Sequence, residues 1–397
     1  MRKADFRVLI YSQDGFGLGH LRRNLNISQQ ISRCCPSASI LLIADSPVAP
    51  FFKLPPKCDF VKLPTIVKVD MGVWRANHLS MDYREVLKIR SEIIQNVFLS
   101  FRPHILLVDH MPHGVLGELA VPLEKLKRLF PETRVILGLR DILGAPEAIC
   151  QYWLKERAYD TSEMYYDCIN VYGSPDIYDV TTEYQFPENL VSKTTYCGYV
   201  SRQTTPKKLN ERALSGLFGK KREWLVLVCG GGGADASFFM DKFIDATRTL
   251  SPHIPYNAII CTGPFMHPQQ SHLLKQKAKG LPVHITHQGQ DNVHLLNRAD
   301  LVISMAGYNT ITEIMRYRKK AIVVPRPGPS AEQTMRTRIM SERGLFSTIH
   351  PTQLTAKSFS EAILQKLEKG AESIREDILP DLNGAAQAAT SMLSQAA

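Results

Sequence analysis

Hydrophobic and polar positions along the chain alternate between two kinds of segment. Short, continuous apolar runs rich in β-branched residues are separated by longer stretches in which apolar residues recur at helical spacing. The buried strands of a parallel sheet have such continuous runs, and helices cover both faces of the sheet. The pattern therefore predicts an α/β protein. The strand-like runs lie within residues 7–12, 39–45, 59–64, 103–110, 133–141, 168–173, 194–200, 223–233, 256–263, 282–288, 299–307 and 320–327.

The longest helical pattern covers residues 81–101. Asp82 and Glu85 have the spacing of a capping box at its start, and Arg102-Pro103 marks its end. Apolar residues recur at steps of three and four, which predicts a single buried face. That face is predicted to consist of Val86, Ile89, Ile93, Val97 and Phe101.

A polar segment with proline and glycine, residues 201–223, interrupts the alternation. Because 397 residues exceed what one hydrophobic core usually serves, two domains are expected. We predict an N-terminal acceptor-side domain at 1–205, a linker at 206–222, a second domain at 223–375 and a helical tail at 376–397. Each half has its own glycine-rich strand-to-helix turn, which favours two doubly wound Rossmann-like domains with a cleft between them.

The cysteines and the apolar runs indicate where the protein resides. The eight cysteines are scattered without a C-x-x-C pair, which favours a reducing compartment and disfavours a zinc knuckle. No apolar run approaches the ~20 residues that cross a bilayer. Asp14 also comes too early for a secretory signal. We therefore expect a cytoplasmic location.

The net charge narrows the class of partner. A formal charge of +10 favours nucleotides, acidic lipid headgroups or nucleic acid, but no five-residue basic block occurs, so nucleic acid is not expected. Residues 46–57 join Phe51 and Phe52 to lysines in a predicted surface loop. Such a loop is typical of peripheral membrane contact, although an apolar loop folded over the core explains it equally well.

A glycine-rich segment, GFGLGHLRRNL at 15–25, follows the first predicted strand. Such a turn, here with Gly17 and Gly19, lets the backbone approach a ligand, and the next helix offers N–H groups to an anion. The segment does not match the G-x-G-x-x-G fingerprint. We also identify no acidic residue that clearly closes the second strand in the ribose-binding position, so NAD is not expected.

Polar side chains in this segment have two interpretations each. His20 lies where it could accept a proton at the mouth of the sheet, or it bonds only to backbone groups in a tight turn. Arg22 and Arg23 face an anionic acceptor or pair with carboxylates. The residues alone leave both choices open.

Two further strands end in charged residues. Asp109 closes the run at 103–110, at the edge where ligands bind in such folds, so a His20–Asp109 base pair is one hypothesis. A carboxylate that caps the following turn is the other. Arg140 and Asp141 end the next run and either face an anionic acceptor or pair with one another.

The second half contains three segments suited to a nucleotide. Four glycines after a strand form a turn whose amides can approach a diphosphate, or they allow close packing of helix on strand. The segment SMAGYNTITE at 304–313 is a second strand-to-helix turn, and its glutamate could accept both hydroxyls of a ribose. A third loop leads to a Glu-Gln pair. The candidate residues are Gly230, Gly231, Gly232, Gly233, Ser304, Gly307, Tyr308, Asn309, Thr310, Glu313, Glu332 and Gln333.

These segments resemble the GT-B glycosyltransferases, in particular the MurG-like group (family 28), which moves N-acetylglucosamine from UDP onto a lipid-linked acceptor. SMAGYNTITE is similar to that family's S-x-A-G-x-x-T-x-x-E, and residues 320–337 are similar to its K-P-x-[IV]-x-[IV]-P followed by [DE]-Q. GFGLGHLRRNL is more similar to the G-x-G-H-x-x-R of nucleotide-sugar hydrolases of sialic-acid-like sugar pathways. Over its full length the chain resembles bacterial proteins known only as predicted glycosyltransferases.

The resemblance implies a GT-B fold and a role for each matching residue. Glu313 would hold the ribose, residues 307–310 the diphosphate, Gln333 and Glu332 the sugar hydroxyls, and the backbone at Gln288 and Gly289 the base. The glycine turn 230–233 lacks the hydroxyl residue that the family has there, and residues 109–118 lack its second glycine loop. The acceptor therefore stays open.

The expected activity is inverting transfer of a sugar from a UDP-sugar to an acceptor hydroxyl, with His20 as base and Asp109 as its orienting group. A lipid-linked or polysaccharide acceptor fits the resemblance, and the location expected is cytoplasmic, with contact at the inner face of the membrane. No metal is expected, since the chain has no D-x-D motif. No cofactor is expected beyond the nucleotide-sugar co-substrate, for which UDP-sugar is favoured. Nucleotide-sugar hydrolysis and non-catalytic binding of a sugar nucleotide are the alternatives, and the sequence does not determine the oligomeric state.

Overall fold

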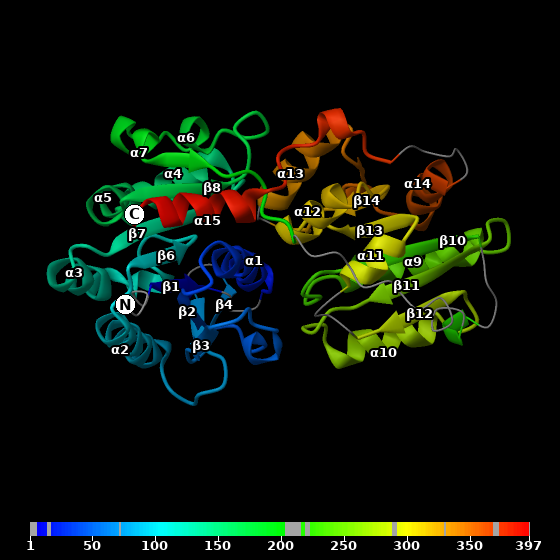
Figure 1. Cartoon of the computed structure of the whole chain (residues 1–397). Helices are drawn as coiled ribbons and strands as arrows, with labels where there is room; N and C mark the ends of the chain where they lie inside the picture. The colour runs from blue at the N-terminus through cyan, green and yellow to red at the C-terminus, as the bar shows by residue number, and fades with distance from the viewer. Residues whose placement is uncertain are drawn as a thin grey trace. The chain divides into compact units, whose positions relative to one another are not determined.

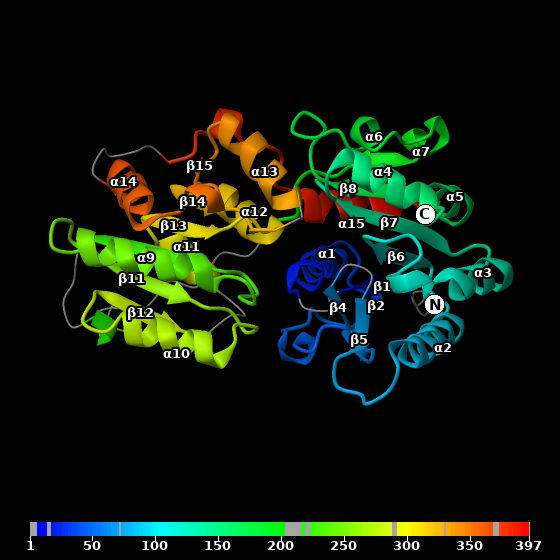
Figure 2. The ribbon, with the colours of Figure 1, turned by 180° about the vertical axis from the view of Figure 1, so that it is seen from behind.

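The computed structural model describes residues 6–13, 17–70, 73–202, 216–218, 223–287, 292–328, 331–367 and 373–396. The chain forms two compact units, one made of residues 1–202 and 383–397 and the other of residues 203–382. Figures 1 and 2 show the chain from opposite sides. Each unit is built around its own parallel sheet.

The first unit is a seven-stranded sheet with the strand order β3-β2-β1-β6-β7-β8-β9, and every pair in it is parallel. The segment between β3 and α2 forms a separate two-stranded antiparallel hairpin, β4–β5. Its elements are β1 (Arg7–Ser12), α1 (Gly19–Cys34), β2 (Ser39–Ala44), η1 (Ala49–Phe51), β3 (Cys58–Lys62), β4 (Ile66–Asp70), β5 (Val73–Ala76), α2 (Tyr83–Phe101), β6 (Ile105–Asp109), η2 (Val115–Gly117), α3 (Ala120–Leu129), β7 (Arg134–Arg140), α4 (Pro146–Lys155), α5 (Ala158–Tyr165), β8 (Cys168–Tyr172), α6 (Val180–Glu183), α7 (Glu188–Ser192), β9 (Thr194–Tyr196) and α15 (Gly384–Ser394).

The second unit is a six-stranded sheet with the order β12-β11-β10-β13-β14-β15, again parallel throughout. In Figure 2, α9 lies between α14 and α10. Its elements are β10 (Trp224–Cys229), α9 (Ser237–Leu250), β11 (Tyr256–Cys261), α10 (Pro268–Lys277), β12 (Val283–Thr286), α11 (Val293–Arg298), β13 (Leu301–Met305), α12 (Tyr308–Arg316), β14 (Ala321–Val324), α13 (Ala331–Glu342), β15 (Ser347–Thr348), η3 (Pro351–Gln353), α14 (Ala356–Leu367) and η4 (Glu376–Ile378).

The strand order reverses once in each sheet. In the first sheet β1 lies between β2 and β6, and in the second β10 lies between β11 and β13. Loops that leave such a pair of strands diverge to opposite faces, and ligands bind where they separate, at the carboxyl ends of the strands. The segments following β1 and β6 in one unit, and β10 and β13 in the other, are therefore the places to look for a site.

The prediction of alternating strands and helices with parallel sheets is confirmed, since each predicted apolar run contains one strand of a parallel sheet. Sequence analysis missed the β4–β5 hairpin and the two-residue strand β15. The last helix, α15, contacts α1 and β8 of the first unit (Figure 1). Most of the predicted linker 206–222 lies outside the described residues.

The buried face of α2 differs from the prediction. Asp82 caps the helix by accepting a hydrogen bond from the Arg84 backbone N–H, and the helix ends before Arg102, as expected. The buried side chains, however, are Val86, Arg90, Ile94 and Phe98, whereas Ile89 is exposed. The prediction was correct for Val86, and Ile93, Val97 and Phe101 are partly buried. It was wrong for Ile89, and it left out Arg90, whose guanidinium is buried.

No described helix combines the length and the apolar character needed to span a membrane. In the predicted surface loop at 46–57, the side chain of Phe51 at the end of η1 is 69% exposed.

Candidate functional site

The carboxyl edge of the first sheet brings His20 and Asp109 together. His20 lies in the first turn of α1, after the glycine-rich segment that follows β1, and Asp109 is the last residue of β6. The Nδ1 atom of His20 lies 2.7 Å from the Oδ2 atom of Asp109. The carboxylate is fully buried, whereas 17% of the His20 side chain is exposed. The hypothesis of a His–Asp pair is thus the geometry observed.

Besides the contact with His20, the Asp109 carboxylate accepts three hydrogen bonds from two donor atoms. The Nη2 atom of Arg23 lies 2.7 Å from Oδ1 and 2.8 Å from Oδ2, and Asn24 Nδ2 donates to Oδ2 at 3.1 Å. Burial alone would raise the pKa of Asp109, but the charges and hydrogen bonds of Arg23 and His20 outweigh it and lower that pKa well below its usual range. Asp109 is therefore ionised. His20 Nδ1 lies near this carboxylate and also 2.8 Å from Arg23 Nη2.

Arg23 and Arg22 have different positions. The Arg23 guanidinium is buried, pairs with Asp109 and lies over the Tyr172 ring at 5.4 Å, so for this residue the structure favours pairing over acceptor contact. Arg22 is partly exposed, as are Gly17 and Arg140. An acceptor-side role for Arg22 and Arg140 stays a prediction.

His110 is a site residue that sequence analysis missed. It follows Asp109 directly, with φ of 79°, and its ring centroid lies 5.3 Å from that of His20. Its Nδ1 atom is buried and has no hydrogen-bond partner among the described residues. Burial, followed by the charge of Arg140, lowers the pKa of His110 well below its ordinary value, so its ring is neutral. Two imidazoles therefore lie side by side where one was expected.

The helices that follow the switch-point strands begin alike. α1, α9 and α12 start at Gly19, Ser237 and Tyr308 with no side-chain cap and no acidic residue in the first turn. Among the described helices, α3, α11 and α15 begin in the same way, whereas α2 and α6 are capped by aspartates. An uncapped helix start leaves its positive dipole end uncompensated, which suits an anionic ligand.

The glycine turn 230–233 serves packing at two of its positions. A Cβ atom on Gly230 would overlap that of Ala236, and one on Gly233, where φ is 91°, would overlap the Thr262 carbonyl oxygen. At Gly231, where φ is 62°, no atom lies within 4 Å of such a Cβ. Gly230 and Gly233 therefore allow close packing, as one interpretation of the turn predicted. The open space beside Gly231 is compatible with the other interpretation, in which the turn approaches a ligand.

The second predicted turn is shorter than expected. Ser304 belongs to β13, where it pairs with Cys229 and Val323, and its side chain is fully buried. Tyr308 is also buried, as the first residue of α12. Strand β13 extends to Met305, so Ser304 lies in the strand rather than in the turn. Contact of Ser304 and Tyr308 with a ligand stays a prediction. Gly307, Asn309, Thr310 and Glu313 are partly exposed along the start of α12.

Arg336 links the turn after β13 to the start of α13, and sequence analysis did not identify it. Its buried Nη1 atom donates to the Ala306 carbonyl at 3.0 Å and to Glu332 Oε1 at 2.9 Å. Gln333 Oε1 accepts from the Arg326 backbone N–H at 3.0 Å. Glu332 and Gln333 therefore hold the loop after β14 in place. The spacing of four residues between Glu332 and Arg336 was the signal that could have revealed this pair.

A second ion pair joins the glycine turn to the same loop, since Asp235 pairs with Arg326. Gln288 and Gly289, predicted to contact the base, lie outside the described residues. Within the described ranges no group of three or more His, Cys, Asp or Glu side chains is arranged to hold a metal ion.

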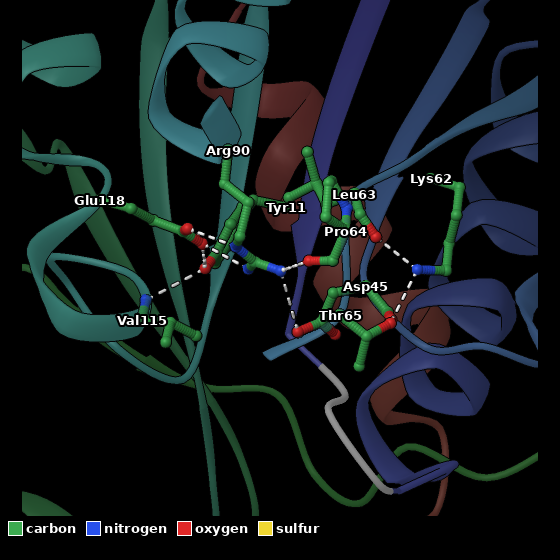
Figure 3. Close-up of polar contacts among 9 residues, drawn as sticks. All are labelled: Tyr11, Asp45, Lys62, Leu63, Pro64, Thr65, Arg90, Val115 and Glu118. Atoms are coloured by element: carbon green, nitrogen blue, oxygen red, sulfur yellow. Dashed lines mark hydrogen bonds and ion pairs between the residues drawn. The ribbon is translucent and has the colours of Figure 1, made fainter. Parts of the chain in front are cut away.

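A buried polar network lies behind the carboxyl edge of the first sheet (Figure 3). Arg90 donates to Glu118 through Nε at 2.6 Å and Nη2 at 2.7 Å, and through Nη1 to the Pro64 carbonyl at 2.7 Å. The Tyr11 hydroxyl donates to Glu118 Oε1 at 2.6 Å. These bonds fix the loops that follow β3 and β6 against α2.

Asp45 belongs to this network and corrects the sequence analysis. It follows β2 directly, so an acidic residue does close the second strand. Its carboxylate is buried and lies 3.4 Å from Arg90 Nη1. This carboxylate is thus already paired inside the protein, and the expectation against NAD stays a prediction.

Comparison with known proteins supports the resemblance. Residues 225–390 match the family model of the Glycosyltransferase family 28 C-terminal domain. A UDP-N-acetylglucosamine--N-acetylmuramyl-(pentapeptide) pyrophosphoryl-undecaprenol N-acetylglucosamine transferase of an Exiguobacterium species is 34% identical over 150 residues, 37% of this chain. That alignment spans 40% of the relative's length.

Solved structures resemble the whole chain. MurG of Acinetobacter baumannii has a TM-score of 0.55 at 14% identity and covers 97% of this chain and 95% of its own. The glycotransferase of kitacinnamycin has a TM-score of 0.66 at 13% identity, with coverages of 99% and 100%. The chain has the GT-B fold, with two Rossmann-like domains. The predicted similarity to the MurG-like group is likewise confirmed for the second half.

Proposed function

We propose that this protein is a metal-independent, inverting glycosyltransferase that moves a sugar from a nucleotide-sugar donor, with UDP favoured, to an acceptor hydroxyl. The observation that carries the proposal is the His20–Asp109 pair, 2.7 Å apart at the carboxyl edge of the first sheet. Its support in the second half is the match of residues 225–390 to the family 28 domain.

His20 is the proposed base. Because Asp109 is buried and ionised, it holds the proton on Nδ1 and directs the Nε2 lone pair away from itself. The partly exposed side of the imidazole then accepts the proton of the acceptor hydroxyl as its oxygen attacks the anomeric carbon. The bond from that carbon to the nucleotide diphosphate breaks, and a single displacement inverts the centre.

The second unit is proposed to bind the donor. A partly exposed Glu313 on α12 would accept the ribose hydroxyls, and the uncapped starts of α9 and α12 would stabilise the charge that develops on the leaving diphosphate. Arg336 positions this site through the Ala306 carbonyl and Glu332.

For the acceptor and the cellular location we propose only broad classes. The Exiguobacterium relative is named for a pyrophosphoryl-undecaprenol acceptor, which makes a lipid-linked acceptor the first to test. The exposed Phe51 supports contact of the first unit with a membrane surface. Metal independence is proposed because the chain has no D-x-D motif.

Product analysis separates transfer from its alternatives. The protein is incubated with UDP-N-acetylglucosamine labelled in the sugar, with and without a bacterial lipid extract. Transfer predicts labelled lipid, and UDP that forms only with the extract. UDP and free labelled sugar without extract would indicate hydrolysis. Binding of the nucleotide sugar without any product would favour the non-catalytic alternative.

A further inference from the structure

The second unit contains a cavity of about 300 Å³ that the proposed reaction does not use. Five of the residues that line it are basic, and none of the other lining residues is acidic among those described. The basic residues are Lys319, Lys320, Arg343, Lys366 and Arg375. The wall between them is formed in part by Leu345, Phe346 and Ile374.

The cavity lies at the amino-terminal edge of the second sheet. Lys319 and Lys320 directly precede β14, and Phe346 directly precedes β15. Because these strands are parallel, both begin at the same edge. The glycine turn and α12 follow the carboxyl ends of β10 and β13, at the opposite edge of the sheet. The cavity is therefore separate from the proposed donor site.

The positive charges in the cavity are only partly compensated. Lys366, in the last turn of α14, makes no hydrogen bond or ion pair with any described residue. Burial, and then the charge of Lys320, lowers its pKa. Lys319 Nζ donates to two carbonyls, those of Asn297 at 2.5 Å and Ala299 at 3.1 Å, rather than to a carboxylate.

Lys320 and Arg375 have contacts of two other kinds. Lys320 Nζ lies 5.7 Å from the centre of the Trp224 ring, and Arg375 pairs with the exposed Asp377 at 3.0 Å. Half-buried ammonium groups that face one another repel, and a bound anion removes that repulsion. Lysine and arginine together supply point charges and forked donors, the combination that suits phosphate oxygens.

We propose that this cavity binds a phosphate-bearing anion, with Lys320 and Lys366 as its principal ligands. Its volume suits a small group such as orthophosphate, pyrophosphate or a phosphorylated headgroup rather than a whole nucleotide sugar. The phosphate can belong to a soluble compound or to an anionic lipid. Both sources share the chemistry of recognition, and the experiment distinguishes them.

Lysine footprinting tests the site in the protein without any amino-acid substitution. The full chain is treated briefly with acetic anhydride, and acetylation of each lysine is measured by mass spectrometry. Lys357, at the opposite end of α14 with its side chain 86% exposed, is the internal control. Inorganic pyrophosphate at about ten times its dissociation constant should lower acetylation of Lys320 and Lys366 about tenfold, because about one site in ten stays empty. Acetylation of Lys357 should not change.

Vesicles identify the source of the phosphate. Protection by phosphatidylglycerol vesicles, but not by pyrophosphate or phosphatidylcholine vesicles, would assign a lipid headgroup. Protection by pyrophosphate assigns a soluble phosphate compound. If neither lowers acetylation of Lys366 relative to Lys357, the proposal is wrong. The result does not depend on the donor site, since pyrophosphate bound there would leave Lys366 as reactive as before.

Discussion

The Nδ1 atom of His20 lies 2.7 Å from the Oδ2 atom of Asp109, although 89 positions separate the two residues in the chain. The contact exists because β1 and β6 are neighbours in the parallel sheet and both end at the same edge. Arg23 and Asn24, which follow His20 on α1, donate to the same carboxylate. A single buried charge therefore fixes the start of α1 and the orientation of the imidazole.

Replacement of His20 by alanine should remove the base while leaving the donor site intact. We expect turnover to fall about 10²- to 10⁴-fold, the usual contribution of a general base. Binding of UDP should not change, because the proposed donor residues lie in the other unit. His78→Ala, at an exposed position, is the matched control. Normal turnover by His20→Ala would assign the base to another group.

Asp109→Asn tests the buried ion pair. The pKa of Asp109 is lowered in the folded protein, so its charge stabilises the fold at any pH above the unfolded value of about 3.9, and this contribution is lost as pH falls below it. At pH 7 the free energy of unfolding of the variant should be lower by about 3–5 kcal/mol, because Arg23 stays buried without its charged partner. The difference from the unmodified protein should shrink below about pH 4.

Urea denaturation at a series of pH values measures this difference. Asp160→Asn removes an exposed ion pair with Arg157 and should cost less than about 1 kcal/mol at every pH. If the two variants lost the same free energy of unfolding at neutral pH, the charge of Asp109 would not stabilise the fold.

Arg90→Met tests the network of Figure 3. The Arg90 guanidinium is buried against Glu118 and Asp45, and their charges raise its pKa although burial acts in the opposite direction. Loss of the cation leaves two carboxylates buried, so we expect a loss of about 3–5 kcal/mol. Thermal unfolding measures it, with Arg157→Met as the exposed control. A variant as stable as that control would show that the network does not stabilise the fold.

Two glycines should respond differently to alanine. Gly233→Ala places a side chain at φ of 91° against the Thr262 carbonyl, and should destabilise the protein by about 2 kcal/mol or more. Gly307→Ala meets no atom within 4 Å at φ of −66°, so stability should hold while binding of UDP weakens. Unfolding curves with and without UDP separate the two effects. If Gly307→Ala lowered the stability and Gly233→Ala only weakened binding of UDP, the roles assigned to the two turns would be wrong.

The sheets were accessible from sequence because they depend on a local pattern, whereas the His20–Asp109 pair was one of two alternatives that the residues left open. Continuous apolar runs mark parallel strands, and Asp109 directly ends such a run, so its edge of the sheet follows. The motif positions in residues 304–313 and 320–337 predicted the similarity that residues 225–390 have to the family 28 C-terminal domain. Those positions lie around the start of α12 and around the loop that follows β14.

Buried charged residues were not accessible in this way. Arg90 and Asp45 are read as surface residues by any polarity pattern, yet both are buried because partners distant in sequence bond to them. Arg336 is buried by a bond to the distant Ala306 carbonyl and by its pair with the nearby Glu332. His110 was missed for a related reason, since its position depends on a backbone turn with φ of 79° after β6. Long-range pairing decides such cases, and a single sequence does not reveal it.

Thermal unfolding with a panel of nucleotides tests the central claim most directly. A ligand at ~100 times its dissociation constant adds about 2.7 kcal/mol of stability. We predict that UDP or a UDP-sugar raises the midpoint, and that Glu313→Ala abolishes the shift while Glu361→Ala, an exposed change on α14, does not. If no nucleotide or nucleotide sugar raises the midpoint of the unmodified protein, the proposed donor site, and with it the glycosyltransferase function, is contradicted.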